Sequence, residues 1–158
     1  LFVTPKKGGN FMSIYTSRFS NPELKTGKYY VIGITLGEPK FPLGYEKQYQ
    51  CFLLAPERSM WGKSHEEFSR LYRAKLEKIG AWKIGAMLAS FEKWAEGKDI
   101  VLTCFEDVRD PSQHCHRIDF AEWVAERLGI SIIELKDDSK VRYKEKKAVP
   151  KKLQMFLF

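Results

Sequence analysis

The sequence predicts an α/β fold, a three-layer Rossmann-like or flavodoxin-like sandwich whose mainly parallel sheet has about four to five strands. The 158 residues suit one domain, and 44% hydrophobic residues are enough to fill a single core. Apolar runs of strand length alternate with segments in which apolar residues recur at helical spacing. After residue 64 the order is helix, strand, loop, helix, strand, which is typical of a crossover between parallel strands.

The first half of the chain supplies two strands and a long loop. Residues 11–19 mix β-branched and aromatic residues before the turn signal at 20–22, and they predict the first strand. Residues 28–36 predict the second strand. Residues 40–61 contain several turn-forming residues, and we interpret them as a long ordered loop with one short strand near 51–54.

The second half of the chain alternates between helices and strands. Ser64 and Glu67 have the spacing of a capping box, which predicts the start of a helix that runs to residue 79. The near-continuous apolar run at 99–105 is typical of a strand that is covered on both faces. The remaining predicted elements are a helix over 82–95, a helix from about 114–117 to 128 and a last strand over 131–135.

A basic tail follows the last predicted strand. The net charge is +7, and residues 136–152 contain eight Lys or Arg against three acids, so this segment carries +5 and the rest only +2. We therefore divide the chain into a single α/β domain over 1–136 and a basic C-terminal tail over 137–158. The tail ends in the apolar sequence LQMFLF, and two arrangements are open: the tail extends into solvent, or its end docks on the body or on a neighbouring chain.

Cysteine usage and hydropathy indicate a compartment. Cys51, Cys104 and Cys115 are an odd number in a chain large enough to fold without disulfides, so we expect free thiols and a cytoplasmic location. The longest apolar stretches are far shorter than the roughly 20 residues needed to span a bilayer, and residues 1–10 do not resemble a signal peptide. We expect no membrane partner, and the oligomeric state stays open.

The loop after the strand at 99–105 concentrates reactive side chains. Ligands of open parallel sheets bind at the carboxyl ends of strands, which makes this loop the first candidate site. The sequence His114-Cys115-His116-Arg117 stands where the third helix begins, and a helix N-terminus attracts anions and favours the thiolate form of cysteine. We predict Cys115, Glu106 and His116 as catalytic residues and Arg117, Arg18 and Thr16 as anion-binding residues.

Residues of the first strand join this prediction through the expected strand order. The strand at 99–105 is expected beside the strand at 11–19, which brings Arg18 and Thr16 toward the loop. Structural roles compete with these assignments. Cys104 can be a buried apolar residue of the strand, and Cys115 can pack under the loop. Arg117 can form a salt bridge with Asp119 or Glu122.

The run DIVLTCFEDVRDPSQHCHRIDFAEWVAERLGI at 99–130 resembles the C-terminal signature of the domain of unknown function 488 family. That signature has a hydrophobic strand, a small residue or Cys and an acid, a short loop with Pro, and Cys-His-Arg opening a helix. IYTSRFSNPEL at 14–24 and FSRLYRAKLEKI at 68–79 are also similar, so the resemblance covers residues 12–135. Residues 28–45 lack the family's Asp-Arg motif. The family has no established reaction, so the resemblance implies the fold.

The sequence argues against several cofactor sites. A zinc site from Cys104, His114, Cys115 and His116 is disfavoured, because structural zinc uses paired ligands on two knuckles and the sequence has no second pair. A phosphatase loop of the Cys-x5-Arg type is absent, and so are the Gly-rich loops that bind NAD or ATP. The sequence therefore predicts no metal and no cofactor.

Two classes of function compete. The leading hypothesis is an enzyme or binding domain that acts on a phosphate-bearing substrate, a nucleotide or a nucleic-acid end, at the Cys-His-Arg helix start. The alternative is a non-enzymatic module that binds nucleic acid or protein through the tail and an aromatic loop with Phe41, Tyr45, Tyr49 and Trp61. A thiol or acid–base enzyme acting on a neutral metabolite is a third possibility.

Overall fold

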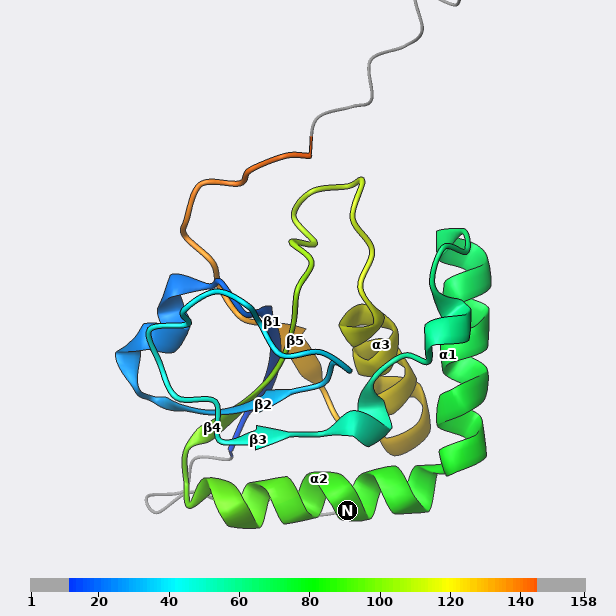
Figure 1. The fold of residues 1–158 in the computed structure, drawn as a ribbon. Helices are drawn as coiled ribbons and strands as arrows, with labels where there is room; N and C mark the ends of the chain where they lie inside the picture. The colour runs from blue at the N-terminus through cyan, green and yellow to red at the C-terminus, as the bar shows by residue number, and fades with distance from the viewer. Residues whose placement is uncertain (1–11, 145–158) are drawn as a thin grey trace, which may run out of the picture.

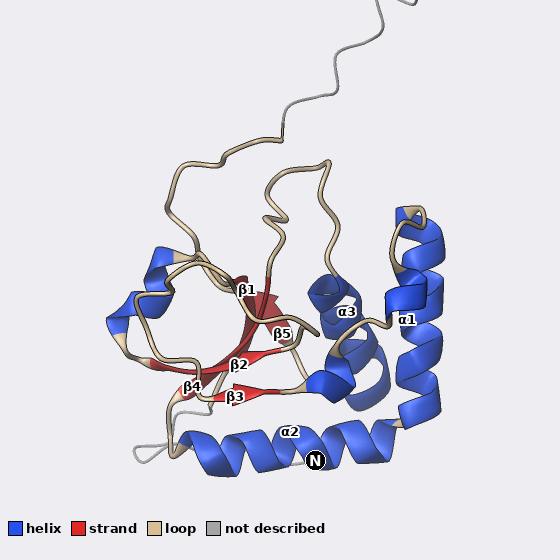
Figure 2. Ribbon diagram, viewed as in Figure 1, coloured by secondary structure: helices blue, strands red, loops and turns tan. Residues whose placement is uncertain are grey.

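A computed structural model describes residues 12–144, and its central feature is one parallel sheet of five strands in the order β3-β2-β4-β1-β5 (Figures 1 and 2). The prediction of an α/β fold with a parallel sheet is confirmed. The strand order is neither of the two common doubly wound orders. The strands are β1 (Ile14–Arg18), β2 (Tyr29–Gly33), β3 (Tyr49–Gln50), β4 (Asp99–Cys104) and β5 (Ile132–Glu134). The α-helices are α1 (His65–Ile79), α2 (Ala81–Ala95) and α3 (His116–Leu128), and the 3-10 helices are η1 (Pro22–Thr26), η2 (Phe52–Leu54) and η3 (Arg58–Met60).

The central strand is β4, whose apolar run predicted a strand covered on both faces. Residues 100–104 are all buried, and β4 pairs in parallel with β2 on one side and β1 on the other. The expected neighbourhood of the strands at 99–105 and 11–19 is confirmed, because Ile14 lies opposite Ile100 and Arg18 opposite Cys104.

Side-chain alternation divides the core into two parts of unequal size. Ile32 and Leu102 face the larger part, which contains apolar residues of α1, α2 and α3. Val31 and Val101 point to the opposite face, where they pack with Leu24 of η1. All three α-helices therefore lie on one side of the sheet, and a 3-10 helix covers part of the other side (Figure 1).

Most predicted boundaries differ from the structure by one or two residues. Ser64 caps α1 as predicted, since its Oγ accepts a hydrogen bond from the amide of Glu67 at 3.2 Å. The position predicted for the short strand, near 51–54, is wrong. The strand is β3 at Tyr49–Gln50, and residues 52–54 form η2. The amide of Cys51 donates to the carbonyl of Gly33 at 2.8 Å, which ends the pairing of β3 with β2 just before η2 begins.

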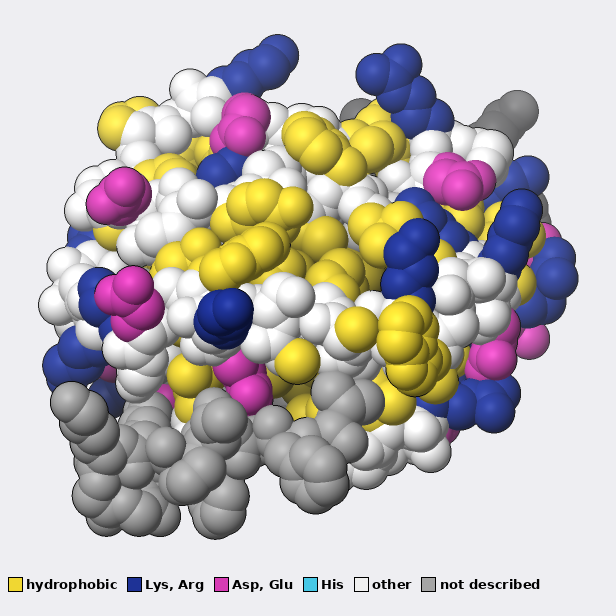
Figure 3. Space-filling model, turned by 90° about the horizontal axis from the view of Figure 1, so that it is seen from below, with side chains coloured by type: hydrophobic (Ala, Val, Ile, Leu, Met, Phe, Trp, Pro, Cys, Tyr) yellow, Lys and Arg dark blue, Asp and Glu magenta, His cyan; other side chains and the backbone are white. Residues whose placement is uncertain are grey.

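The outer face of α2 carries exposed aromatic side chains. Trp82 is 85% exposed and Trp94 is 46% exposed. Figure 3 shows hydrophobic side chains gathered on the face of the molecule that is seen from below, where α2 lies. Among residues 12–144, no helix is both long and apolar enough to span a bilayer.

The start of the predicted tail lies against the body. Arg18 Nε donates to Asp137 at 2.7 Å, Arg109 Nη1 donates to the carbonyl of Ser139 at 2.6 Å, and the amide of Lys144 donates to Asp110 at 3.0 Å. The LQMFLF segment lies outside the described residues. The boundary at 136 stays a prediction, but the eight residues that follow it include hydrogen-bonding partners of the domain.

Candidate functional site

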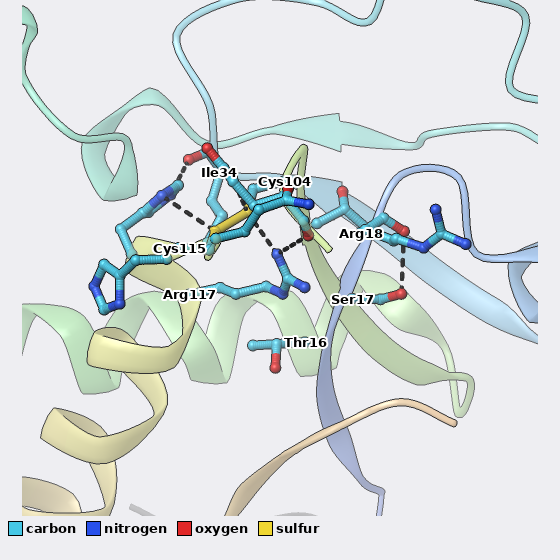
Figure 4. The surroundings of a disulfide bond; sticks show 12 residues. Thr16, Ser17, Arg18, Ile34, Cys104, Cys115 and Arg117 are labelled. Atoms are coloured by element: carbon cyan, nitrogen blue, oxygen red, sulfur yellow. Dashed lines mark hydrogen bonds between the residues drawn. A yellow bond between two sulfur atoms is a disulfide. The ribbon is translucent and has the colours of Figure 1, made fainter. Parts of the chain in front are cut away.

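The loop from β4 to α3 closes on itself through a disulfide. Cys104, the last residue of β4, is bonded to Cys115, the residue before α3 (Figure 4). Because these two cysteines are bonded to each other, the expectation of free thiols is wrong for them; it holds for Cys51, which is free and buried. The two cysteines meet because the loop between β4 and α3 folds back, so that α3 begins beside the end of β4.

The guanidinium of Arg117 is held inside the fold. Arg117 is 1% exposed, and its Nε and Nη2 contact the carboxylate of Glu134 at 2.9–3.1 Å. Its Nη1 donates to the Sγ of Cys104 at 3.0 Å and to the carbonyl of Glu106 at 2.8 Å. The predicted partners Asp119 and Glu122 are wrong, because β5 pairs with β1 and brings Glu134 under the start of α3.

The other predicted anion-binding residues also meet carboxylates of the same chain. Thr16 is buried, and its Oγ1 donates to Glu134 at 2.9 Å. Arg18 pairs with Asp137 and lies 3.8 Å from Asp107. A cavity of only about 60 Å³ separates these groups, and its lining includes Arg18, Arg117, Asp107, Glu134 and Asp137. The sheet brings the predicted residues together, but their positive charges are already compensated.

Asp107 belongs to this ionic cluster through Arg109. The hydrogen bond from the Arg109 guanidinium lowers the pKa of Asp107 below its ordinary value, and the charge of Arg18 acts in the same direction. The Asp107 carboxylate and the Arg109 guanidinium are therefore both charged at neutral pH. The cluster fixes the loop after β4 to the segment that follows β5, since Arg109 also donates to the carbonyl of Asp137 at 2.9 Å.

His116 is a buried, neutral histidine beside the disulfide. Its Nε2 donates to the carbonyl of Ile34 at 2.7 Å, because a carbonyl can only accept. Burial lowers the pKa of His116 to about 4, so the ring is uncharged at pH 7. Its Nδ1 lies 3.7 Å from the Sγ of Cys115 and carries the free lone pair. The predicted catalytic residues Cys115 and His116 are thus in contact.

A pocket of about 480 Å³ lies beside these residues. It lies where β2 and β4 end, and the starts of α1 and α3 close it. All three histidines of the chain line it. The lining residues are Thr35, Leu36, Gly37, Pro56, Trp61, Gly62, Lys63, His65, Phe68, Phe105, Glu106, His114 and His116.

The position of this pocket follows from the strand order. The chain leaves β2 toward β3 at one edge of the sheet, and it leaves β4 through α3 toward β5 at the other edge. The two connections diverge between β2 and β4, and such a switch point is where open α/β sheets bind ligands. The pocket therefore occupies the place that the fold leaves open.

The polar groups of the pocket are held by hydrogen bonds. His114 Nε2 lies 2.8 Å from a carboxylate oxygen of Asp119 and 3.0 Å from Ser69 Oγ. The ring of His65 stacks on that of His114, with centroids 5.1 Å apart. Glu106, a predicted catalytic residue, reaches the pocket from the end of β4. These residues supply groups that accept and donate protons.

Sequence reasoning missed several of the pocket residues. His65, Phe105 and Lys63 were not predicted, although His65 directly follows the helix cap at Ser64. Of the four residues in the predicted aromatic loop, Trp61 lines the pocket. Tyr45 instead donates to the carbonyl of Phe19 at 2.7 Å, which is a packing role. Tyr49 lies against Phe91 and Trp94, and Phe41 is 42% exposed.

In comparisons with known proteins, no family model, no curated protein and no solved structure matches the chain. The resemblance to the domain of unknown function 488 family therefore stays a prediction. The geometry of the pocket and of the residues around it carries the functional proposal.

Proposed function

We propose that the chain binds a nucleotide-class ligand, a flat ring that bears a phosphate, in the pocket at the carboxyl ends of β2 and β4. The observation that supports this best is the combination of aromatic walls, three histidines and two helix N-termini around one hollow of about 480 Å³. Pockets of roughly 300–1,000 Å³ are typical for small-molecule ligands. The proposal keeps the expected substrate class and moves the site away from Arg117 and Arg18.

The apolar part of the pocket suits a planar ring. Trp61 is 56% exposed and Phe105 is 45% exposed, so each has a ring surface that the core does not use. Phe68 of α1 adds a third aromatic wall. Stacking of a base on an aromatic side chain contributes about 1–3 kcal/mol and does not require a particular base.

The polar rim of the pocket suits an anionic group. Lys63 and His65 stand at the start of α1, and His114 stands at the start of α3, whereas the neutral His116 already donates its proton to the Ile34 carbonyl. The N-terminal ends of these helices, of 15 and 13 residues, carry partial positive charge and unpaired amides. Glu106 is the one carboxylate in the described lining, so the rim favours a phosphate.

The same residues would supply chemistry to a bound nucleotide. His114 is oriented by Asp119 at 2.8 Å, which is the arrangement of a histidine that transfers protons. Glu106 enters the pocket from the other side as a second acid–base group. We propose these two as the catalytic pair, with hydrolytic cleavage at the phosphate as the reaction class. From the Cys-His-Arg sequence at 115–117 we also propose that the chain is a member of the domain of unknown function 488 family.

Calorimetric titration of the full chain tests the proposal. Nucleoside monophosphates, the matching nucleosides and inorganic phosphate are the probes. We expect Trp61→Ala to weaken the binding of nucleosides and nucleotides by about 5- to 150-fold, from the loss of one stacking contact. Lys63→Gln is expected to weaken the binding of nucleotides and to leave the binding of nucleosides unchanged.

Two surface variants are the matched controls for this titration. Trp82→Ala removes an 85% exposed tryptophan, and Lys93→Gln removes a lysine of α2; neither residue lines the pocket. Both controls are expected to bind like the unmodified chain. Absence of nucleotide binding, or equal losses in Trp61→Ala and Trp82→Ala, would contradict the proposal.

A further inference from the structure

Three buried side chains with metal-binding atoms converge at the start of α3. Cys104, Cys115 and His116 are all buried, and one ligand atom from each lies within 4.8 Å of the others. The sequence argued against zinc because no second ligand pair follows the Cys-His motif. The fold does not add a second pair, but it brings the distant Cys104 into contact with this motif, since Cys104 ends β4 directly beside Cys115.

The orientation of His116 fits a metal ligand. The carbonyl of Ile34 accepts the proton of Nε2 at 2.7 Å, which leaves the lone pair on Nδ1. Metal-binding histidines typically donate their other ring nitrogen to a carbonyl or carboxylate in this way. Nδ1 lies 3.7 Å from the Sγ of Cys115. Sulfur and nitrogen ligands of a tetrahedral zinc ion stand about 3.5 Å apart, given zinc–sulfur and zinc–nitrogen bonds of about 2.3 and 2.0 Å.

The surroundings of Cys104 also suit a metal-bound thiolate. Arg117 Nη1 donates to its Sγ at 3.0 Å, and a charged hydrogen bond of this kind stabilises a negatively charged sulfur. A carboxylate oxygen of Glu106 lies 3.3 Å from the same Sγ and reaches the pocket. A fourth ligand is therefore available from Glu106 or from the pocket side.

We propose that, when the disulfide is reduced, Cys104, Cys115 and His116 bind a zinc ion. A dithiol or phosphine reductant supplies two electrons, and the cleaved sulfur–sulfur bond takes up two protons to give two thiols. Binding of Zn²⁺ then releases both thiol protons and forms two zinc–sulfur bonds and one zinc–nitrogen bond. The disulfide and the zinc site are alternative states of the same two sulfur atoms. Two thiolates and an imidazole are a ligand set that selects zinc, and the fourth position is left for Glu106 or for a group that enters from the pocket.

Titration with Co²⁺ tests the site, because cobalt reports thiolate coordination by its absorption spectrum. The full chain is reduced with a phosphine, freed of reductant under anaerobic conditions and titrated. We expect a sulfur-to-cobalt charge-transfer band that saturates at about one equivalent and disappears when Zn²⁺ is added. The oxidised chain, with the same sequence and fold, is expected to give no band.

Single variants distinguish this site from the remaining thiol. Cys115→Ser and His116→Gln are expected to lose the band, with circular dichroism confirming that each variant is folded. Cys51→Ser is the matched control and is expected to keep the band, because Cys51 lies outside the cluster. No band in the reduced chain, an equal band in the oxidised chain, or loss of the band only in Cys51→Ser would overturn the proposal. Nucleotide binding is measured separately, so either proposal can fail alone.

Discussion

Arg117 of α3 and Glu134 of β5 form a salt bridge with Nη2 and Oε1 2.9 Å apart, and the arginine is 1% exposed. The pair joins the start of the last helix to the edge of the sheet. A buried guanidinium is stable only while its counter-charge is present. The buried Arg117 can therefore contribute to stability only while Glu134 supplies its counter-charge.

Removal of this counter-charge is expected to destabilise the fold strongly. Glu134→Ala leaves the Arg117 charge buried without its partner, which costs about 3–5 kcal/mol of unfolding free energy. Urea unfolding measures this difference. Glu126→Ala removes an exposed partner of Arg73 and is expected to cost at most about 1 kcal/mol. Equal effects of the two variants would show that Arg117 is not held by Glu134.

The disulfide is expected to be visible in the thiol count and in stability. The oxidised, denatured chain should react with a thiol reagent at Cys51 alone, and the reduced chain at all three cysteines. Cys104 and Cys115 are 11 residues apart, so closing this loop contributes about 3 kcal/mol to stability in the chain-entropy account. Urea unfolding with and without reductant, in the presence of a chelator, measures it. Three reactive thiols before reduction would contradict the bond.

The neutral state of His116 is expected to make stability depend on pH. Its folded pKa of about 4 lies below the ordinary value of 6.5, so only the unfolded chain takes up this proton between these values. The contribution of His116 is constant above pH 6.5 and falls by about 1.4 kcal/mol per pH unit below it, until about pH 4. Urea unfolding of the oxidised, chelator-treated chain at pH 7 and pH 5 should differ by about 2 kcal/mol from this group.

A variant separates His116 from other titrating groups in that experiment. His116→Gln keeps a donor toward the carbonyl of Ile34 and removes the titration. Its stability should change less between pH 7 and pH 5 than that of the unmodified chain. An unchanged pH dependence would show that the burial of His116 does not set it.

The first residues of the tail are expected to contribute to stability. A chain that ends at residue 136 lacks Asp137 and Ser139, the partners of Arg18 and Arg109. A chain that ends at residue 144 keeps both. The shorter chain should melt about 2–4 °C lower than the longer one for each kcal/mol lost, as thermal unfolding measures. Identical melting temperatures would show that these contacts do not stabilise the domain.

The parts of the fold that the sequence predicts are those with local signals. The apolar run of β4, the capping residue Ser64 and the stop at Gly129 each act within a few neighbouring residues. Such signals depend on backbone geometry and burial, which a window of sequence contains. The parallel sheet followed from the same signals, because alternating helices and strands permit few arrangements.

The partners in the candidate site could not be predicted in this way. Arg117 has acids nearer in the sequence than Glu134, and only the pairing of β5 with β1 selects the more distant one. Cys104 and Cys115 are bonded because the loop after β4 brings the start of α3 back to the end of β4, and the spacing of the two cysteines does not reveal this. His65 and His114 stack on each other in the pocket although they are 49 positions apart in the sequence. These choices are made by three-dimensional packing, not by local preference.

The two edge strands of the sheet are very short. β3 has two residues and β5 has three, whereas β4 at the centre has six. An edge strand exposes backbone amides and carbonyls that can recruit a strand of another molecule, and short edges offer few of them. The longest and most apolar strand is enclosed on both sides by β1 and β2. The taper of the sheet from centre to edge therefore limits aggregation through strand pairing.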